Sequence, residues 1–512
     1  MLAKVYSGAV YGIDAYKVEI EVNAAHGEPL IVIVGLPDAA VKESKDRVFT
    51  AMLNSGFFPH VGRTTINLAP ADVKKEGPSY DLPIAIGMIC TRGEISPAIL
   101  HHTAIIGELA LSGEVRRVRG VLPITLMARE MKLKSIIVPD GNAEEAAVVH
   151  GINVIPVKTL REAADILAGK REMNPLRIDA TSIFKNTNSE HDDDFADVKG
   201  QEQAKRAIEV AVAGGHNMLM VGPPGTGKTM LAKRISSILP ELTLEEALEA
   251  TRIHSIAGTL KAHASIVTRR PFRSPHHTIS DAGLLGGGTH PMPGEVSLSH
   301  RGVLFLDELP EFHRNVLEVL RQPLEDGVVT ISRAAANVTF PCQFMLVSAM
   351  NPCPCGYFSD PKRECRCTQH QIQHYRNKIS GPLLDRIDIH IEVPSVSLND
   401  LSNAPKGEKS DEIRRRVTNG RKIQLDRFKS SPKLHSNSSM GSRHIQKFCI
   451  IEDDAKEMLK QAIAQLNFSA RAYDRILKVA RTIADLAGSA TITQEHIQEA
   501  IQYRVLDRQL WV

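Results

Sequence analysis

The chain has 512 residues, which is too long for one hydrophobic core, so we expect two to four domains. Its hydrophobic content of 43% and charged content of 24% are those of a soluble globular protein, and its net charge of +3 leaves only local patches for binding an anionic polymer. A membrane span and a signal peptide are not expected, because there is no apolar run of about 18 residues and the first residues are not apolar. Seven cysteines, four of them clustered, are not a secreted disulfide framework and favour a cytoplasmic protein.

Residues 1–168 predict an α/β domain of their own. Val18–Val22 alternates as a half-buried strand does, whereas Leu30–Val34 is continuously apolar and favours a central strand. Asp38 is placed to cap the helix that follows. Further strands are expected at 64–68, 105–109, 135–138 and 153–157, with helices at 82–90 and 160–167. Residues 169–194 then become polar and acidic, which indicates a solvated linker before the next domain.

The most informative stretch follows a short apolar segment at 218–221 and fits the phosphate-binding P-loop pattern. Its residues are Gly222, Pro223, Pro224, Gly225, Thr226, Gly227, Lys228 and Thr229. Glycines let backbone N–H groups turn toward phosphate oxygens, and the helix expected next adds its positive N-terminal end. Lys228 can reach the β- and γ-phosphates, and Thr229 can hold Mg²⁺. The stretch therefore predicts an ATP site.

A second phosphate-handling motif consists of four apolar residues, 303–306, followed by two acids. Ligands of open α/β sheets bind at the carboxyl ends of strands, where these acids would lie. Asp307 would bind Mg²⁺, directly or through water, and Glu308 would polarise the attacking water. Ordinary acids at a strand–loop junction are the alternative, but the P-loop upstream favours the nucleotide role.

A larger set of motifs resembles the AAA+ module of magnesium-chelatase subunit I and its bacterial relatives, the ComM/YifB family. The motifs are RPFRSPHH at 270–277, GGG at 286–288, PGEVSLSH at 293–300, LFLDELPEF at 304–312 and GPLLDRID at 381–388. The resemblance spans essentially the whole chain. It implies an AAA+ P-loop NTPase core with a parallel sheet over 195–394, and a basic connector and helical lid over 395–512.

The resemblance also implies roles for three polar residues. Asn351, after an apolar strand, looks like sensor 1, which orients the attacking water; a polar strand end is the alternative. Arg386 looks like the arginine finger given to a neighbouring subunit. An ion pair with Asp385 or Asp388 is the alternative. Arg471 looks like sensor 2 on the lid, although Arg475, one helical turn away, fits the same role.

Two insertions distinguish this class from plainer AAA+ proteins. Residues 252–300, rich in glycine and histidine, occupy the place of the helix-2 insert, and 325–333 with 338–340 predict a hairpin before sensor 1. In the family both point into a ring pore. Arg333 near the hairpin tip is a candidate for contacting DNA, and a solvated surface arginine is the alternative.

Four cysteines lie directly after Asn351, in two close pairs separated by a nine-residue loop: Cys353, Cys355, Cys365 and Cys367. Four thiolates can supply a zinc site, but the one-residue gap within each pair departs from the usual spacing. Zn²⁺, free thiols and a redox role all stay open. Downstream, basic residues between 414 and 443 favour either phosphate contacts or a solvated helix face.

The N-terminal domain resembles the Lon-protease fold, a ribosomal S5 domain 2-like α/β architecture. The likeness includes Gly77-Pro78-Ser79, where that family carries its nucleophile. A serine nucleophile needs an activating base, and aligning Gly107-Glu-Leu109 puts the apolar Leu122 near the position of the family's lysine. We therefore expect a protease-like scaffold without peptidase activity.

The resemblance implies a ring-forming AAA+ ATPase, a homo-hexamer that moves single-stranded or branched DNA. Its task would be helicase or branch-migration work in homologous recombination and natural transformation. Two other classes compete: a chelatase-type or chaperone-type ATPase that remodels a protein partner, and an ATP-dependent protease, if another base serves Ser79. Local basic residues favour DNA, and the near-neutral net charge does not.

Overall fold

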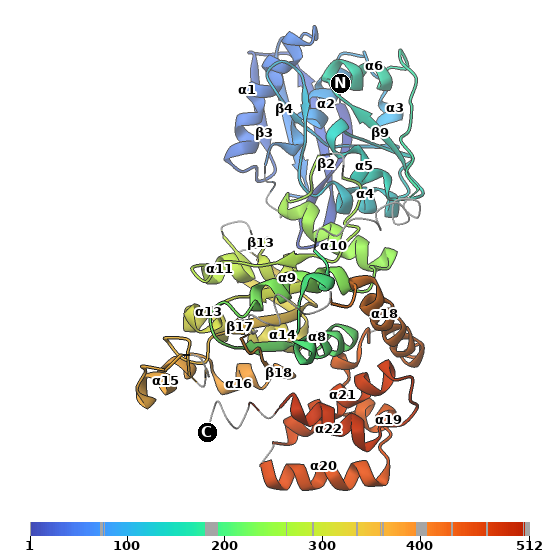
Figure 1. Cartoon of the computed structure of the whole chain (residues 1–512). Helices are drawn as coiled ribbons and strands as arrows, with labels where there is room; N and C mark the ends of the chain where they lie inside the picture. The colour runs from blue at the N-terminus through green and yellow to red at the C-terminus, as the bar shows by residue number, and fades with distance from the viewer. Residues whose placement is uncertain are drawn as a thin grey trace.

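The computed structural model describes residues 2–71, 75, 77–179, 193–262, 264–288, 291–333, 336–358, 360, 363–395, 407–431, 434–466, 469–504 and 506. Most of the predicted linker, residues 180–192, lies outside this range, and the domain boundaries stay predictions. In the described part of the chain, no helix combines the length and the apolar character needed to cross a bilayer. Figure 1 shows an N-terminal α/β part in blue and cyan, a central α/β part in green and yellow, and a helical C-terminal part in red.

The N-terminal part is built on a mixed sheet with the strand order β3-β4-β2-β1-β5-β8-β9. Its strands are β1 (Leu2–Tyr11), β2 (Asp14–Ala25), β3 (Leu30–Val34), β4 (Arg63–Ala69), β5 (Thr103–Ile105), β8 (Ser135–Pro139) and β9 (Asn153–Val157). Helices α1 (Ala39–Asn54), α2 (Asp81–Thr91) and α6 (Leu160–Leu167) pack on one face, and α4 (Val121–Glu130) and α5 (Ala143–Ala147) on the other. The short elements are η1 (Pro78–Tyr80), α3 (Pro97–Leu100), β6 (Glu108–Leu109), β7 (Val115–Arg116) and η2 (Asp140–Asn142).

The position of β3 corrects one prediction. Leu30–Val34 does form a strand, but it pairs only with β4 and lies at the edge of the sheet, with Leu30 52% and Val34 41% exposed. An apolar run of five residues therefore did not indicate a central strand here. The predicted cap is confirmed, since the Asp38 carboxylate accepts a hydrogen bond from the Val41 N–H at 2.7 Å. Strand β1, which pairs with β2 along its whole length, was missed.

The central part contains a five-stranded sheet in which every neighbouring pair is parallel. In spatial order its strands are β11 (Phe272–Arg273), β14 (Val303–Leu306), β17 (Met345–Met350), β10 (Met218–Val221) and β18 (Ile389–Glu392). Helices α8 (Glu202–Gly214) and α9 (Lys228–Ile238) bury one face, and α13 (Arg314–Glu318) and α16 (Gly381–Leu384) help to bury the other. Because both faces are covered, β10 and β14 are continuously apolar, whereas β18, at the edge of the sheet, ends on the exposed Glu392.

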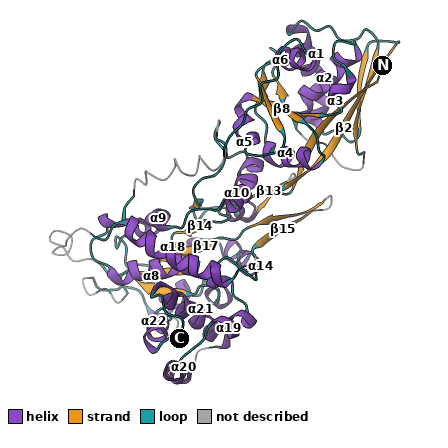
Figure 2. Cartoon of the chain, turned by 90° about the vertical axis from the view of Figure 1, so that its right-hand side faces the viewer, coloured by secondary structure: helices purple, strands orange, loops and turns teal. Residues whose placement is uncertain are grey.

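Two insertions extend from this sheet. The first contains α10 (Leu244–Ala257), α11 (Asp281–Leu285), β12 (Gly286–Gly287), β13 (Met292–Pro293) and α12 (Glu295–Leu298). The second follows η4 (Leu309–Glu311) and α14 (Arg321–Asp326), and it is the antiparallel hairpin of β15 (Val328–Arg333) and β16 (Ala336–Pro341). The predicted hairpin is thus confirmed, and Figure 2 shows it projecting from the central part near the tip of β2.

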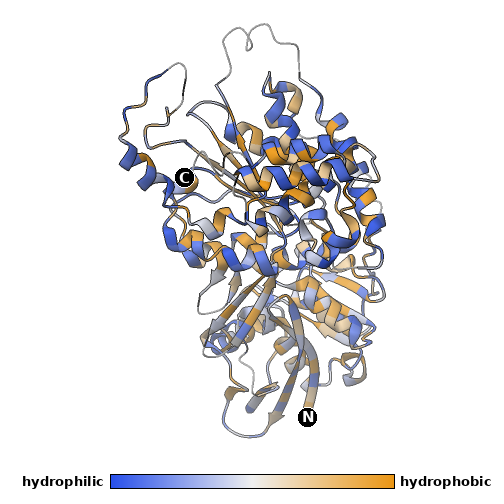
Figure 3. Ribbon diagram, turned by 90° about the horizontal axis from the view of Figure 1, so that it is seen from below, coloured by the Kyte–Doolittle hydropathy of each residue, from blue (hydrophilic) through white to orange (hydrophobic). Residues whose placement is uncertain are grey.

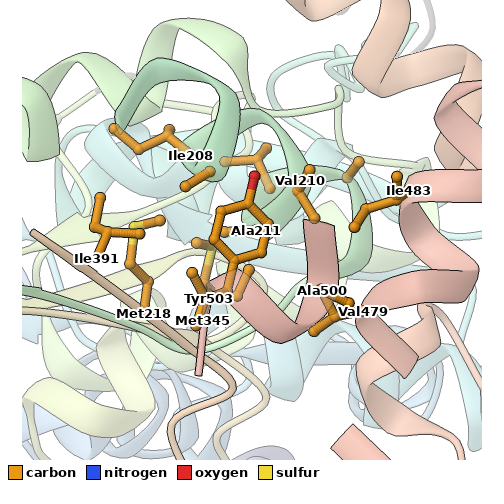
Figure 4. Packing of buried hydrophobic residues seen from close by; sticks show 14 of the residues in the cluster. Ile208, Val210, Ala211, Met218, Met345, Ile391, Val479, Ile483, Ala500 and Tyr503 are labelled. Atoms are coloured by element: carbon orange, nitrogen blue, oxygen red, sulfur yellow. The ribbon is translucent and has the colours of Figure 1, made fainter. Parts of the chain in front are cut away.

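The C-terminal part consists of α18 (Ser410–Arg427), η5 (Asn437–Ser439), α19 (Ser442–Phe448), α20 (Asp453–Leu466), α21 (Ala470–Leu486) and α22 (Gln494–Gln502). Figure 3 shows hydrophilic and hydrophobic faces on these helices. The hydrophobic faces of α21 and α22 share one core with α8 and the sheet. Tyr503 lies there beside Met218 and Met345, the first residues of β10 and β17 (Figure 4). The lid therefore packs at the amino-terminal edge of the sheet.

The N-terminal part contacts both insertions. The buried Glu145 carboxylate of α5 accepts hydrogen bonds from the Leu122 N–H at 3.0 Å and from the Ser255 hydroxyl of α10. At the turn between β1 and β2, the Tyr11 hydroxyl donates to the Asn337 backbone oxygen of β16 at 3.0 Å. Ile13 in the same turn packs against the hydrophobic core beneath the β15–β16 hairpin.

Candidate active site

The P-loop joins the end of β10 to the start of α9. The backbone turns through left-handed conformations at Gly225 and Gly227, with φ of 77° and 86°, which glycine adopts without steric cost. The ammonium of Lys228 donates to the Gly222 and Pro223 carbonyl oxygens at 2.6 and 2.9 Å. Its third contact is the Asn351 Oδ1, 3.2 Å away. The lysine side chain thus lies inside the loop that should hold the phosphates.

The environment of Lys228 suits an anionic ligand. Burial lowers the pKa of its ammonium group to about 8, although the carboxylates of Asp307 and Glu308 act in the opposite direction. A charged group that is short of solvation gains strongly from a partner of opposite charge. The helix N-terminus of α9 adds backbone N–H groups aimed at the same place.

Thr229 and Asp307, the two predicted Mg²⁺ ligands, are in direct contact. The threonine hydroxyl donates to the Asp307 Oδ2 at 2.6 Å, across the gap between α9 and the end of β14. A hydroxyl and a carboxylate that already share this position fit Mg²⁺, which prefers oxygen ligands. Thr229 and Asp307 would hold Mg²⁺, which would offset negative charge on the phosphates.

Glu308 has the geometry of a functional residue under backbone strain. Its φ of +51° is unusual for a residue other than glycine and costs of order 1 kcal/mol. Its backbone N–H donates to the Asp307 Oδ1 at 2.9 Å, which keeps the two acids in a fixed relation. The carboxylate is about half exposed, as access to a water molecule requires.

Sequence reasoning missed a residue next to Glu308. His277, in the segment after β11, places its Nδ1 3.5 Å from the Glu308 Oε2. Its ring also lies against His276, with 4.1 Å between ring centroids. The sequence shows the His-His pair, but the pairing of β11 with β14, which brings His277 beside Glu308, is visible only in the structure. His277 therefore lies in contact with the carboxylate that was predicted to activate water.

Asn351 lies beside the P-loop because its strand pairs with β10. Met350, the last residue of β17, is opposite Val221, so the two strands end together at the carboxyl edge of the sheet. The same register brings in the end of β14, where Leu306 is opposite Ser348. The structure thus brings Lys228, Asp307 and Asn351 to one edge, as the resemblance implied.

Arg386 and Arg471 lie at the other edge of the sheet. The Asn217 side-chain amide, directly before β10, donates to the Arg386 backbone oxygen at 2.9 Å. The Arg386 guanidinium pairs with Glu325 rather than with Asp385 or Asp388, and it also donates to the Pro382 oxygen at 2.7 Å.

The lid supplies the second arginine at this edge. Arg471, with its side chain 69% exposed, lies 3.6 Å from the Asp385 carboxylate. Arg475 points inward, contacting Asp388 at 3.7 Å and the Ile387 oxygen at 3.4 Å. Of the two arginines considered for sensor 2, Arg471 is the one whose charge is available to a partner.

These arginines line a cavity of about 750 Å³ at the amino-terminal edge. Arg386, Arg471, Arg475 and Lys478 contribute positive charge, and Glu325 and Asp388 contribute negative charge. This edge is separated from Lys228 by the length of β10 and then by the P-loop. Strand β10 has four residues, each with a rise of about 3.3 Å. In this arrangement, both arginines lie at the opposite edge of the sheet from Lys228.

Most of the basic residues in the C-terminal stretch have partners within the chain. Arg414 donates to the Ser237 oxygen at 2.8 Å, Arg416 pairs with Glu209 at 2.5 Å, and Arg421 donates to the Val212 oxygen at 2.9 Å. Arg427 pairs with Asp485. Of the two interpretations of this stretch, phosphate contacts and a solvated helix face, these arginines fit neither, because they fasten α18 to α8 and α9 and to α21. Lys433 lies outside the described residues.

Two further predicted positions can be located. The four cysteine sulfurs of Cys353, Cys355, Cys365 and Cys367 lie within 4.8 Å of one another. Arg333 ends β15, but its side chain lies outside the described part of the structure, so its contact with DNA stays a prediction.

In the N-terminal part, Leu122 is fully buried at the start of α4. Ser79 lies in the one-turn helix η1, before α2. The absence of peptidase activity stays a prediction.

Comparison with known proteins agrees with this geometry. Models of magnesium chelatase subunit ChlI match residues 194–401 and 20–142, and a model of its C-terminal part matches 407–504. The chain is 45% identical to the competence protein ComM of Haemophilus influenzae over 515 residues, covering 99% of this chain and 98% of that protein. The chain belongs to the ComM/YifB family of magnesium-chelatase-like AAA+ ATPases. It is also 43% identical to YifB of Escherichia coli, with the same coverage.

Membership of the ComM/YifB family makes the chain an ATPase that takes ATP and Mg²⁺. A 191-residue stretch is 27% identical to Lon protease 2 of Bacillus subtilis, covering 33% of this chain and 34% of that protein. The predicted fold class is confirmed: a Lon-protease-like α/β domain, an AAA+ core with a parallel sheet, and a helical lid.

Proposed function

We propose that the chain is one subunit of a hexameric ring that uses ATP hydrolysis to move DNA. Its task would be branch migration in homologous recombination and in natural transformation. The observation that carries the proposal is the separation of Arg386 and Arg471 from the chain's own P-loop. An ATPase with these arginines at the opposite edge of its sheet needs a second copy to complete each nucleotide site.

The residues at the carboxyl edge divide the chemistry among them. Lys228 and the loop N–H groups hold the phosphates, and Glu308 takes the proton of the attacking water that Asn351 helps to orient. Arg386 of a neighbouring subunit would then offset the charge that develops on the transferred phosphoryl group. Mg²⁺ held by Thr229 and Asp307 would supply further charge stabilisation at the phosphates.

The β15–β16 hairpin is the proposed contact with the polymer. It lies between α14 and β17, so one end of it is continuous with the strand that carries Asn351. A change at the nucleotide therefore has a short covalent path to the hairpin. The polar tip residue Arg333 is the position that we propose to meet the DNA phosphates.

The similarity to ComM, a competence protein, favours DNA as the polymer. The internal pairing of the basic residues in α18 leaves the hairpin as the main candidate for binding. The test is ATP turnover by the full chain with four-way junctions, forked duplex, linear duplex and unfolded protein. We expect several-fold stimulation by branched DNA, and a stimulation that weakens with rising salt.

The alternative is a chelatase-type or chaperone-type ATPase that remodels a protein partner. The family models named for magnesium chelatase, which match segments from residue 20 to residue 504, favour it. Stimulation by unfolded protein, with no response to any DNA, would support this alternative and contradict the DNA proposal. In the same ATP-turnover assay, an Arg333→Ala variant should lose the stimulation by DNA and keep its basal turnover.

A further inference from the structure

The four clustered cysteines have the spacing of a tetrahedral metal centre. The Cys353 sulfur lies 3.4 Å from that of Cys355 and 3.7 Å from that of Cys365. The sulfurs of Cys355 and Cys365 are 3.6 Å apart. A zinc ion bound to four thiolates at about 2.3 Å sets the sulfurs about 3.8 Å apart. The measured separations are close to this value and far beyond the length of about 2 Å of a disulfide bond.

The turn that carries the first cysteine pair is closed by the backbone and faces solvent on one side. The Gly356 N–H donates to the Cys353 backbone oxygen at 3.0 Å, and the Cys353 and Cys355 sulfurs lie side by side in this turn. Cys353 is buried, whereas Cys355, Cys365 and Cys367 are partly exposed. An ion can therefore reach the four sulfurs from solvent and be bound by them as thiolates.

The cluster is packed directly against the nucleotide-binding loop. Gly356 closes the first cysteine turn in a left-handed conformation, with φ of 87°. A Cβ added there would lie 2.6 Å from the Pro224 Cδ, so the turn touches the P-loop closely. Cys353 is only two residues beyond Asn351. The cluster therefore borders two parts of the site at once.

The second cysteine pair connects the cluster to a helix. Cys367 is followed at once by Thr368, which caps α15 (Gln369–Arg376) through its side chain. At the other end of this helix, Arg376 donates to the Pro352 oxygen at 3.1 Å, and its guanidinium lies over the Phe358 ring. Helix α15 is thus fastened to the cysteine turn at both ends.

We propose that Cys353, Cys355, Cys365 and Cys367 bind one Zn²⁺ ion, and that this ion holds the P-loop and Asn351 in the arrangement that binds nucleotide. In the segment that carries the two cysteine pairs, the bound ion does the stabilising work that a hydrophobic core does elsewhere in the chain. Without it, the turn beside Pro224 and the start of α15 would lose the link that joins the two cysteine pairs. The proposal concerns nucleotide binding and does not depend on what the ring moves.

Metal analysis of the full chain, purified without chelator, tests the site. We expect about one Zn²⁺ per chain, and none in a Cys365→Ser/Cys367→Ser double variant, which changes the pair farther from Asn351. Cys90→Ala, at a buried cysteine of the N-terminal part, is the matched control and should keep its zinc. Cobalt(II) introduced in place of zinc should give the absorption of a tetrahedral thiolate complex.

Zinc-free wild-type protein with four reactive thiols, or iron in place of zinc, would overturn the metal assignment. So would zinc that persists in the double variant.

Affinity for a fluorescent ADP tests the second half of the proposal. In the double variant we expect at least tenfold weaker binding, with thermal melting and circular dichroism confirming that the rest of the chain is folded. Zinc removed from the wild type by a chelator, and then restored, should weaken and recover the same affinity. Unchanged ADP affinity in zinc-free, folded protein would contradict the proposal that the ion holds the P-loop and Asn351 in place.

Discussion

The side-chain amide of Asn217 donates a hydrogen bond to the backbone oxygen of Arg386 at 2.9 Å. Asn217 directly precedes β10, and the P-loop follows the other end of the same strand. The bond therefore fixes the proposed arginine finger to the edge of the sheet that faces away from its own nucleotide site. A ring in which this edge meets the P-loop of the next subunit would complete each site.

Arg386→Ala should bind ATP and fail to hydrolyse it, with a loss that can reach 10³-fold or more. Lys228→Ala should be inactive for a different reason, because it lacks the lysine that holds the phosphates. Mixed rings of the two variants contain some interfaces in which both halves are intact, so turnover should reappear on mixing. Co-purification of differently tagged subunits shows that mixed rings form. If such rings stay inactive, Arg386 acts within its own subunit or only structurally.

Glu308→Gln should separate binding from hydrolysis. The amide keeps the size of the side chain but cannot take a proton from water, so ATP should stay bound and unhydrolysed. Nucleotide binding and single-turnover hydrolysis measured on the same preparation test this expectation. Wild-type turnover in this variant would show that another residue activates the water.

His277→Ala should change the hydrolysis step and leave ATP affinity unchanged. The imidazole lies 3.5 Å from the Glu308 carboxylate and orients it, whereas it makes no contact with Lys228 in the described structure. His276→Ala is the matched control, because its Nδ1 contacts the Thr278 hydroxyl at 2.9 Å instead. The measurement is kcat for both variants at saturating ATP. Equal effects of the two substitutions would argue against a specific role for His277.

Ile13→Asp should uncouple the N-terminal part from the β15–β16 hairpin. The side chain packs against the core beneath the hairpin, and a carboxylate there would have to leave that contact or be buried at high cost. We expect the DNA-stimulated part of ATP turnover to fall and the basal part to persist. Leu2→Asp introduces the same charge at the exposed far end of the β1–β2 pair and should have little effect.

Asp388 predicts a pH-dependent contribution to stability. The carboxyl group is buried, which raises its pKa, but the hydrogen bond from His216 and the charges of His216, Arg475 and Lys478 outweigh burial and lower the pKa to about 2. Because the folded pKa lies below the unfolded value, its stabilisation is present above about pH 4 and is lost as the pH falls toward 2.

Asp388→Asn should therefore lower the melting temperature at pH 7, and the gap to wild type should narrow below about pH 4. Asp385→Asn, at the more exposed neighbouring carboxylate, is the control and should change stability little. A gap that is the same at pH 7 and pH 3.5 would mean that the charge of Asp388 is not the cause.

The nucleotide site was predictable because its motifs are local. Residues 218–221 and 303–306 are short apolar runs that end in phosphate- or metal-binding residues, and both form the expected strands. Thr229 follows β10 and Asp307 follows β14, so both lie at the carboxyl edge of one parallel sheet, where their contact forms. The resemblance to the family supplied the role of Asn351, which one polar residue after a strand does not reveal by itself.

Other features depend on packing between segments far apart in the chain. Leu30–Val34 is as apolar as strands of the central sheet. In the described structure, however, β3 pairs only with β4 and lies at the edge of its sheet. Arg416 and Arg427 look like surface charges in the sequence, but Glu209 and Asp485, contributed by other helices, pair with them.

The sequence by itself determined the ATP site, the fold class and the family, because each rests on patterns of residues that are neighbours in the chain. Only the tertiary structure decided which edge of the sheet Arg386 and Arg471 occupy, and that four sulfurs from two separated turns meet beside Pro224. The physical reason is that these relationships are set by the burial of side chains between elements. That burial depends on the whole core and not on any one stretch.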